Sequence, residues 1–155
     1  MAFGSLSVKG RALRYLAQRE HSRFELERKL ARHVPDTEET SAQVQIATAL
    51  DELAAAGLLS ETRTAESVLV SQGQRYGVRR LRQTLLAKGL GPELVTATLQ
   101  AARSTELERA REVWRRRFGT APCTAAERAR QVRFMAGRGF EGDVIRRVVQ
   151  DADAD

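Results

Sequence analysis

Arginine side chains are the residues of this chain best suited to chemistry, and that chemistry is the binding of anions. The segment 67–92 has no acidic residue, but it contains Arg75, Arg79, Arg80, Arg82 and Lys88. On a continuous helix, Arg75, Arg79 and Arg82 would lie at i, i+4 and i+7 and share one side. Planar guanidinium groups in such a row can bind phosphates or an acidic protein surface. An ordinary solvated helix face is the alternative, but the lack of carboxylates for i, i+4 pairs favours binding.

Two further basic clusters lie in the last third of the sequence: Arg115, Arg116 and Arg117 in one, and Arg133, Arg138, Arg146 and Arg147 in the other. Three consecutive arginines point around a helix, so they cannot all face one surface. The flanking Trp114 and Phe118 have core spacing, which favours packing over base stacking. Tyr76 lies among arginines at a break flanked by glycine, where its ring could stack on a base or cover a contact between helices.

Signatures of an enzyme or of a metal site are missing from the sequence. His21 and His33 are twelve residues apart and have no cysteine–histidine set around them. Cys123, the single cysteine, has no histidine base nearby in the sequence and cannot form an intramolecular disulfide. The glycines of "GRGFEG" do not follow a strand pattern, as a dinucleotide-binding loop would. We therefore predict a protein that is not an enzyme and that uses no metal or cofactor.

Composition favours a helical protein with an anionic partner. Of the 155 residues, 42% are hydrophobic but only 5% are aromatic, and the formal net charge is +6. Cores of leucine, valine and alanine are typical of helices, and an excess of positive charge concentrates polyanions at the surface. The sequence has no apolar run near the roughly 18–20 residues that a membrane span needs. We expect a cytoplasmic protein without a signal peptide or membrane anchor.

Apolar residues recur at helical spacing along nearly the whole chain and indicate nine short helices. Ser22 with Glu25, and Thr124 with Glu127, have the spacing of capping boxes, and these capping roles account for both glutamates. The pattern places Leu13, Leu16 and Ala17 on the buried face of the first helix and Ala129, Val132 and Met135 on that of the eighth. The ninth helix is expected over 142–150, and the acidic tail 151–155 is expected to fray.

Two stretches of the sequence share the same pattern of apolar, basic, glycine and acidic residues. "LLAKGLGPELVTATLQ" at 85–100 matches "MAGRGFEGDVIRRVVQ" at 135–150, with Gly89 aligned to Gly139 and Lys88 to Arg138. Each reads as a corner in which a glycine ends one helix and an acidic residue favours the start of the next. "ELERKL" at 25–30 is comparable to "RLRQTL" at 80–85. The pattern predicts three tandem three-helix repeats in an elongated, curved array, divided into domains 1–60, 61–103 and 104–155.

This arrangement resembles the RecX family of bacterial regulators of the RecA recombinase. The resemblance is carried by four pieces in the same order and spacing: "SRFELERKL" at 22–30, "LDELAAAGLLSE" at 50–61, "GVRRLRQTLLAKGL" at 77–90 and "GRGFEGDVIRRVV" at 137–149. Thr64 departs from it, since the family usually has an aromatic residue before the alanine at the start of the second repeat. The resemblance implies a modular protein that binds along the RecA–DNA filament and inhibits ATP hydrolysis and strand exchange in recombination and DNA repair.

Three functions are compatible with the sequence. The first is a monomeric RecA regulator that also binds single- and double-stranded DNA with little sequence preference, through the basic residues and Tyr76 named above. The second is a sequence-specific helix–turn–helix DNA-binding regulator, although its candidate reading helix "GDVIRRVV" is mostly apolar. The third is an adaptor for an acidic protein, whose binding would be indifferent to DNA. Without a sharply defined ligand motif in the family, the contact residues are inferred from charge alone.

Overall fold

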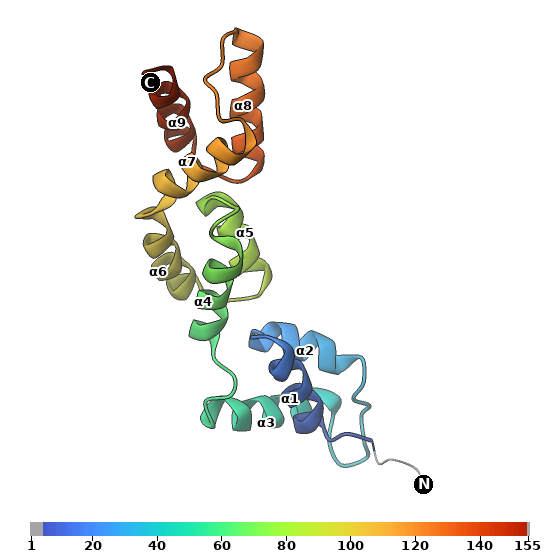
Figure 1. The fold of residues 1–155 in the computed structure, drawn as a ribbon. Coiled ribbons are helices and arrows are strands. Elements are labelled where there is room, and N and C mark those ends of the chain that lie inside the picture. Colours follow the sequence, from blue (N-terminus) through green and yellow to red (C-terminus); the bar gives the residue numbers. More distant parts are fainter. Residues whose placement is uncertain (1–4, 155) are drawn as a thin grey trace. The chain divides into compact units, whose positions relative to one another are not determined.

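The computed structural model describes residues 5–154, which form nine helices and no strand (Figure 1). The helices are α1 (Val8–Gln18), α2 (Arg23–Ala31), α3 (Ala42–Ala55), α4 (Glu61–Gln72), α5 (Val78–Ala87), α6 (Pro92–Arg103), α7 (Glu106–Arg117), α8 (Ala125–Gly137) and α9 (Gly142–Ala154). The prediction of an all-α repeat fold is thereby confirmed. Within the described range, no helix is both long and apolar enough to cross a bilayer.

The chain divides into two compact units. The first joins Met1–Thr64 with Lys88–Leu90, and the second joins Ala65–Ala87 with Gly91–Asp155. The first unit therefore holds α1, α2 and α3 together with one of the two predicted corners. The second holds α5 to α9, the greater part of α4 and the other corner. The division into domains 1–60, 61–103 and 104–155 stays a prediction.

The first unit is packed around aliphatic side chains. Ala12, Leu26, Leu30, Leu50 and Leu53 are fully buried and belong to one core cluster. Leu13 was expected on this face, but its side chain is exposed, because the neighbouring Ala12 takes the central position. Small Ala12 lets α1 lie close to α2 and α3, a contact that a leucine there would prevent.

Capping residues begin the helices where the sequence predicts them. The hydroxyl of Ser22 accepts a hydrogen bond from the Glu25 amide at 3.1 Å, and the Glu25 carboxylate accepts one from the Ser22 amide at 3.4 Å. The predicted capping box of α2 is therefore confirmed. At α8 the Thr124 hydroxyl accepts from the Glu127 amide, but the Glu127 carboxylate accepts from the amide of Cys123, one residue earlier than a capping box requires.

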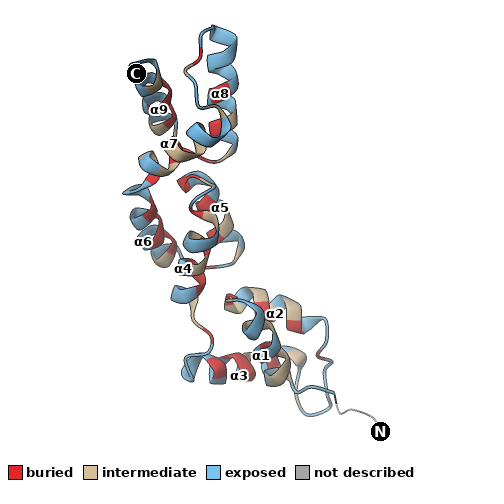
Figure 2. Cartoon of the chain, in the orientation of Figure 1, coloured by how far each residue is buried: buried red, intermediate tan, exposed pale blue. Residues whose placement is uncertain are grey.

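One core cluster of the second unit lies between α7, α8 and α9. Its buried members include Ala110, Met135, Phe140 and Ile145, and the burial of each helix is shown in Figure 2. Ala129 and Val132 were expected in this core, but both are exposed. The face of α8 that is buried instead carries Gln131 and Met135.

Gln131 explains why a polar residue occupies that position. Its side-chain carbonyl accepts a hydrogen bond from the Trp114 indole at 2.8 Å, and its amide donates to the carbonyl of Thr120 at 3.1 Å. The indole ring itself packs against the core. The predicted core role of Trp114 is thereby confirmed, and a polar side chain on α8 satisfies its single donor.

The acidic tail continues α9 rather than fraying, contrary to the prediction. The helix extends to Ala154 because two of its carboxylates find partners on other helices of the second unit. Asp151 pairs with Arg111 of α7, and Asp153 pairs with Arg128 of α8. Asp155 lies outside the described residues.

A corner glycine makes a close backbone contact in the second unit. Gly139 has a positive φ of 86° and ends α8, while its carbonyl accepts a hydrogen bond from the Arg79 amide at 3.0 Å. The Gly77 amide donates to the carbonyl of Arg138 at 2.9 Å. A Cβ on Gly77 would lie 2.4 Å from Gly139 O and from the backbone of Phe140. Neither glycine leaves room for a side chain, so the corner packs directly onto the start of α5.

A buried glutamate completes this contact. Glu106, at the start of α7, is only 3% exposed, and its Oε1 accepts hydrogen bonds from the amides of Val78 and Glu141, both at 3.2 Å. These amides lie at the N-terminal ends of α5 and α9, where free N–H groups and the helix dipole favour a negative charge. The same device occurs in the first unit, where Glu61 accepts from the Arg23 amide at the start of α2.

Replacing Gly139 by alanine tests the corner contact. The new Cβ would lie 2.4 Å from Arg80 Cβ and would hold a left-handed φ, so we expect the free energy of unfolding to fall by at least about 2 kcal/mol. Gly57→Ala has a similar φ of 74° with nothing within 4 Å, and should lose only about 1 kcal/mol. Gly137→Ala, in open space at the end of α8, should be neutral or stabilising. Urea unfolding followed by circular dichroism measures all three, and equal losses at Gly139 and Gly57 would contradict the close contact.

Candidate anion-binding site

Three arginines of the second unit surround the ring of Tyr76. The guanidinium carbon of Arg80 lies 4.6 Å from the ring centroid, and those of Arg75 and Arg138 each lie 5.6 Å from it. Arg75 reaches the ring from the turn between α4 and α5, so the predicted helical row of Arg75, Arg79 and Arg82 is wrong. Gly73 and Gly77 interrupt the helix there. The turn nevertheless brings Arg75 beside Arg138, which is 63 positions away in the sequence.

Phe134 forms the second aromatic face of this cluster. Arg138 lies 5.2 Å and Arg117 5.3 Å from its ring centroid, and Phe118 packs edge-on against the same ring at 5.4 Å. A cavity of about 240 Å³ opens between these elements, and its lining includes Arg75, Arg116, Arg117, Phe134 and Arg138. We call Arg75, Tyr76, Arg80, Arg117, Phe134 and Arg138 the arginine–aromatic cluster.

Carboxylates do not neutralise the cluster. Among residues 5–154, no ion pair involves Arg75, Arg80, Arg117 or Arg138. The neighbouring Arg115 and Arg116 differ, since both pair with Glu112 on the same helix. Guanidinium groups over aromatic faces are partly stabilised by the ring quadrupole, which lets several of them gather without a counter-charge. The arrangement is suited to bind an anion that carries more than one negative charge.

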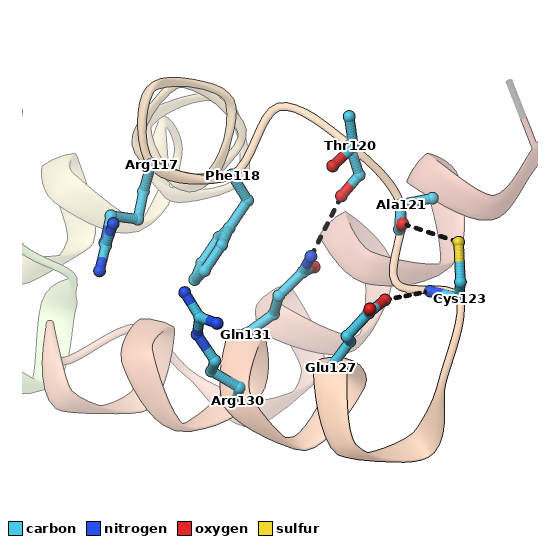
Figure 3. A pocket seen from close by; sticks show the side chains of 8 residues that line it. All are labelled: Arg117, Phe118, Thr120, Ala121, Cys123, Glu127, Arg130 and Gln131. Atoms are coloured by element: carbon cyan, nitrogen blue, oxygen red, sulfur yellow. Dashed lines mark hydrogen bonds between the residues drawn. The ribbon is translucent and has the colours of Figure 1, made fainter.

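A second cavity of about 420 Å³ adjoins the cluster at Arg117 and Phe118 (Figure 3). Its wall contains Cys123, which is exposed, and Glu127, whose carboxylate is held by the Cys123 amide at 2.7 Å. No histidine is among the residues that line it. Across the described part of the chain, no three histidine, cysteine or acidic side chains gather where they could hold a metal ion.

Arg109 positions the turn that carries Arg75 and Tyr76, a role that charge patterns in the sequence did not reveal. Its guanidinium donates hydrogen bonds to the carbonyls of Gly73 at 2.6 Å, Tyr76 at 2.7 Å and Ala102 at 2.8 Å. Burial lowers the pKa of Arg109 below its usual value, against the opposing effect of the Glu106 charge. An arginine that satisfies three backbone carbonyls is a structural residue, and it fixes the aromatic ring at the centre of the cluster.

Lys88 belongs to the first unit and is not a member of the cluster. Its ammonium group donates to Glu25 Oε1 at 2.8 Å, and the Lys88 carbonyl accepts from the Ser22 hydroxyl at 2.5 Å. Arg19 donates to the other oxygen of Glu25 at 2.7 Å. Glu25 therefore does more than cap α2, contrary to the prediction. Burial alone would raise the pKa of Glu25, but the hydrogen bonds and charges of Arg19 and Lys88 outweigh it and lower the pKa to about 2.

The other basic residues predicted to bind are on helices outside the cluster. Arg79 and Arg82 are exposed on α5, Arg133 on α8, and Arg146 and Arg147 on α9. Their role in binding stays a prediction. Phe134 is the member of the cluster that sequence reasoning missed, although its position four residues before Arg138 on a helix brings the two side chains together.

Comparison with known proteins identifies the family. A domain family described as "RecX, third three-helix domain" matches residues 104–149, and "RecX, first three-helix domain" matches residues 9–39. The "Regulatory protein RecX" of Leptothrix cholodnii is 55% identical over 148 residues, which cover 96% of this chain and 90% of that protein. The chain belongs to the RecX family. A second RecX relative, from Ralstonia nicotianae, is 47% identical with the same coverage.

Solved RecX structures have the same fold. The crystal structure of RecX from Lactobacillus salivarius superposes with a TM-score of 0.76 at 19% sequence identity and covers 96% of each chain. A second RecX crystal structure gives a TM-score of 0.72 over 91% of this chain. At this level of identity the agreement extends to the fold alone.

His21 is a second titratable group in the first unit. The residue is fully buried, its Nδ1 lies 3.0 Å from the Arg19 carbonyl, and its Nε2 lies 2.9 Å from the Lys29 ammonium. Burial lowers the pKa of His21, the hydrogen bond to the Arg19 carbonyl opposes this, and the positive charges of Arg19 and Lys29 lower it further. The folded protein therefore holds a neutral imidazole that accepts from Lys29. The Thr64 hydroxyl donates to the His21 carbonyl at 3.0 Å.

Acidification should destabilise the first unit in two steps. The pKa of His21 is lower in the folded state than its ordinary 6.5, so its contribution to stability is present above that pH and declines below it. The pKa of Glu25 is about 2 when folded and 4.5 ordinarily, so its contribution is present above about pH 4.5 and is lost as the pH falls towards 2. Thermal unfolding followed by circular dichroism should show a midpoint that falls between pH 7 and pH 3. In Glu25→Gln the fall below pH 4.5 should be smaller, and an equal fall in both proteins would contradict the ion-pair assignment.

Proposed function

We propose that this chain is a regulator of the RecA recombinase that binds along the RecA–DNA filament and slows ATP hydrolysis and strand exchange. Its relatives bear the name of regulatory proteins. The observation that carries the proposal for this chain is the arginine–aromatic cluster, a group of guanidinium side chains that no carboxylate of the described residues neutralises. Such a surface is suited to a nucleoprotein filament, whose DNA backbone offers a regular row of phosphates.

Inhibition on this account comes from occupancy rather than from a reaction. A protein lodged against a filament restrains the motion of neighbouring recombinase subunits, and such restraint slows any step that requires them to move. Binding to single- and double-stranded DNA would be largely independent of sequence, because phosphate contacts carry no base information. We place the protein in the cytoplasm, with its partner, and expect it to act as a monomer.

No observation favours the sequence-specific alternative. The candidate reading segment 142–149 of α9 buries Ile145, Val148 and Val149, and it contains no asparagine or glutamine, the side chains that read adenine. A competition binding assay, in which one defined duplex competes with random DNA for the protein, distinguishes the RecA regulator from the sequence-specific DNA-binding regulator. A strong preference for one sequence would support the sequence-specific regulator.

The DNA-dependent ATPase of RecA tests the proposed function. At matched salt, a several-fold excess of this chain should slow ATP hydrolysis severalfold, because filament subunits would be restrained. Arg138→Gln should weaken the inhibition, while Arg103→Gln, which removes the same charge from an exposed position of α6 outside the predicted binding residues, should retain it. An unchanged ATPase rate and unchanged filaments at this excess would refute the proposal.

A further inference from the structure

The corners of the two units are built alike but carry opposite charges at one position. In the first, Lys88 and Gly89 pack against the start of α2, and in the second, Arg138 and Gly139 pack against the start of α5. Alignment of residues 25–30 with 80–85 matches the buried leucines of the two helices and places Glu25 where the second corner has Arg80.

The first corner supplies a carboxylate to its own cations. The Glu25 carboxylate lies 2.8 Å from the Lys88 ammonium and 2.7 Å from the Arg19 guanidinium, and its side chain is only 15% exposed. A single carboxylate thus serves two cations at the surface of the corner. The anion position between these two cations is therefore already occupied.

The second corner has the cations but lacks the carboxylate. Arg80 and Arg138 lie on the ring of Tyr76, at 4.6 and 5.6 Å from its centroid, and Arg138 and Arg117 lie on the ring of Phe134. The adjoining cavity of about 240 Å³ is lined by arginines together with Gln74, Val113 and Phe134, and no acidic residue lines it. These like charges repel one another, which raises the electrostatic free energy of the free protein. A bound anion would lower it again.

We infer that the second corner binds single-stranded DNA, with a backbone phosphate in the place that the Glu25 carboxylate occupies in the first. The guanidinium groups of Arg80 and Arg138 would hold that phosphate, and Arg75 and Arg117 would meet the adjacent ones. An unpaired base would enter the cavity and lie against Phe134 and Val113. The inference rests on the proposed function, which supplies DNA as the ligand. It adds where on the chain the DNA binds and that the DNA is single-stranded.

The cavity favours an unpaired strand over the other polyanions. Duplex DNA keeps its bases stacked inside the helix, so it can meet the arginines but cannot fill an apolar cavity. An acidic peptide would satisfy the guanidinium groups, but its short carboxylate side chains have no flat apolar part to place on the phenylalanine ring. A nucleotide supplies both a phosphate and an aromatic base within one residue.

Charge reversal at Arg80 tests the site with the full chain and no recombinase. The probe is a fluorescein-labelled thymidine oligonucleotide of about 20 nucleotides, and its affinity is measured by fluorescence anisotropy at fixed salt. Arg80→Glu should weaken binding by at least about tenfold, because the new carboxylate would pair with Arg138 as Glu25 pairs with Lys88. Arg103→Glu is the matched control, because it changes the net charge by the same amount. Arg103 is exposed on α6 and forms no ion pair among the described residues. This variant should weaken binding by less than about threefold. Equal losses in the two variants would overturn the inference.

Two further measurements distinguish binding of the base from binding of the phosphate. A substitute variant covers the case in which Arg80→Glu misfolds. Phe134→Leu should weaken binding of the oligonucleotide more than that of a duplex of equal length, and equal effects would overturn the assignment of the base to the cavity. Polyglutamate of matched charge should compete poorly with the oligonucleotide, and strong competition would favour an acidic protein segment instead. If Arg80→Glu loses its helical circular dichroism, Arg138→Gln takes its place with the same expected loss.

Failure of the inference is distinguishable from failure of the proposed function. If the wild-type chain binds the oligonucleotide through this site but does not slow the ATPase of RecA, the proposed function fails and the site stands. If the chain slows the ATPase and Arg80→Glu leaves oligonucleotide binding unchanged, the function stands and the site is wrong.

Discussion

The close approach of a corner glycine to the start of an earlier helix is the constraint on which both units depend. In the second unit, Gly77 and Gly139 approach so closely that either Cβ would collide with backbone or with Arg80. In the first unit the glycine approaches a side chain, because a Cβ on Gly89 would lie 2.6 Å from the Cβ of Phe24. Each contact is accompanied by a glutamate, Glu61 or Glu106, that accepts hydrogen bonds at the adjacent helix start. Short helices that bury little surface alone are thereby held at fixed positions within their unit.

Because the geometry is set by backbone, the side chains beside the corner are free to differ. The first unit uses this freedom to build an ion-pair network around Glu25, and the second uses it to gather arginines on Tyr76 and Phe134. One architecture thus yields a corner whose cations pair with a carboxylate and a corner whose cations do not. Half-buried Arg109 contributes to the second by fixing the turn that carries Tyr76. The separation of scaffold and charge explains how the same kind of corner can differ in charge between the two units.

The sequence predicted the features that depend on local spacing, and it missed those that depend on distant partners. Helical periodicity located the nine helices, and the shared pattern of 85–100 and 135–150 located both corners, because each corner needs a glycine with positive φ at the end of a helix. The row of Arg75, Arg79 and Arg82 was wrong, since spacing along a helix has no meaning across the turn after Gly73. The partners of Glu106 and Asp151 lie 28 or more residues away, so neither a buried glutamate nor an ordered tail could be read from its neighbours.

Hydrogen–deuterium exchange with and without single-stranded DNA tests the central claim most directly, because it compares the two corners in one molecule. The account predicts slower exchange on DNA addition in 74–80, 113–118 and 134–140, which surround the second corner. Exchange in 22–30 and 88–90, at the first corner, should remain unchanged. Protection confined to the first corner, or equal at both, would contradict the claim that charge at a shared position determines which corner binds an anion.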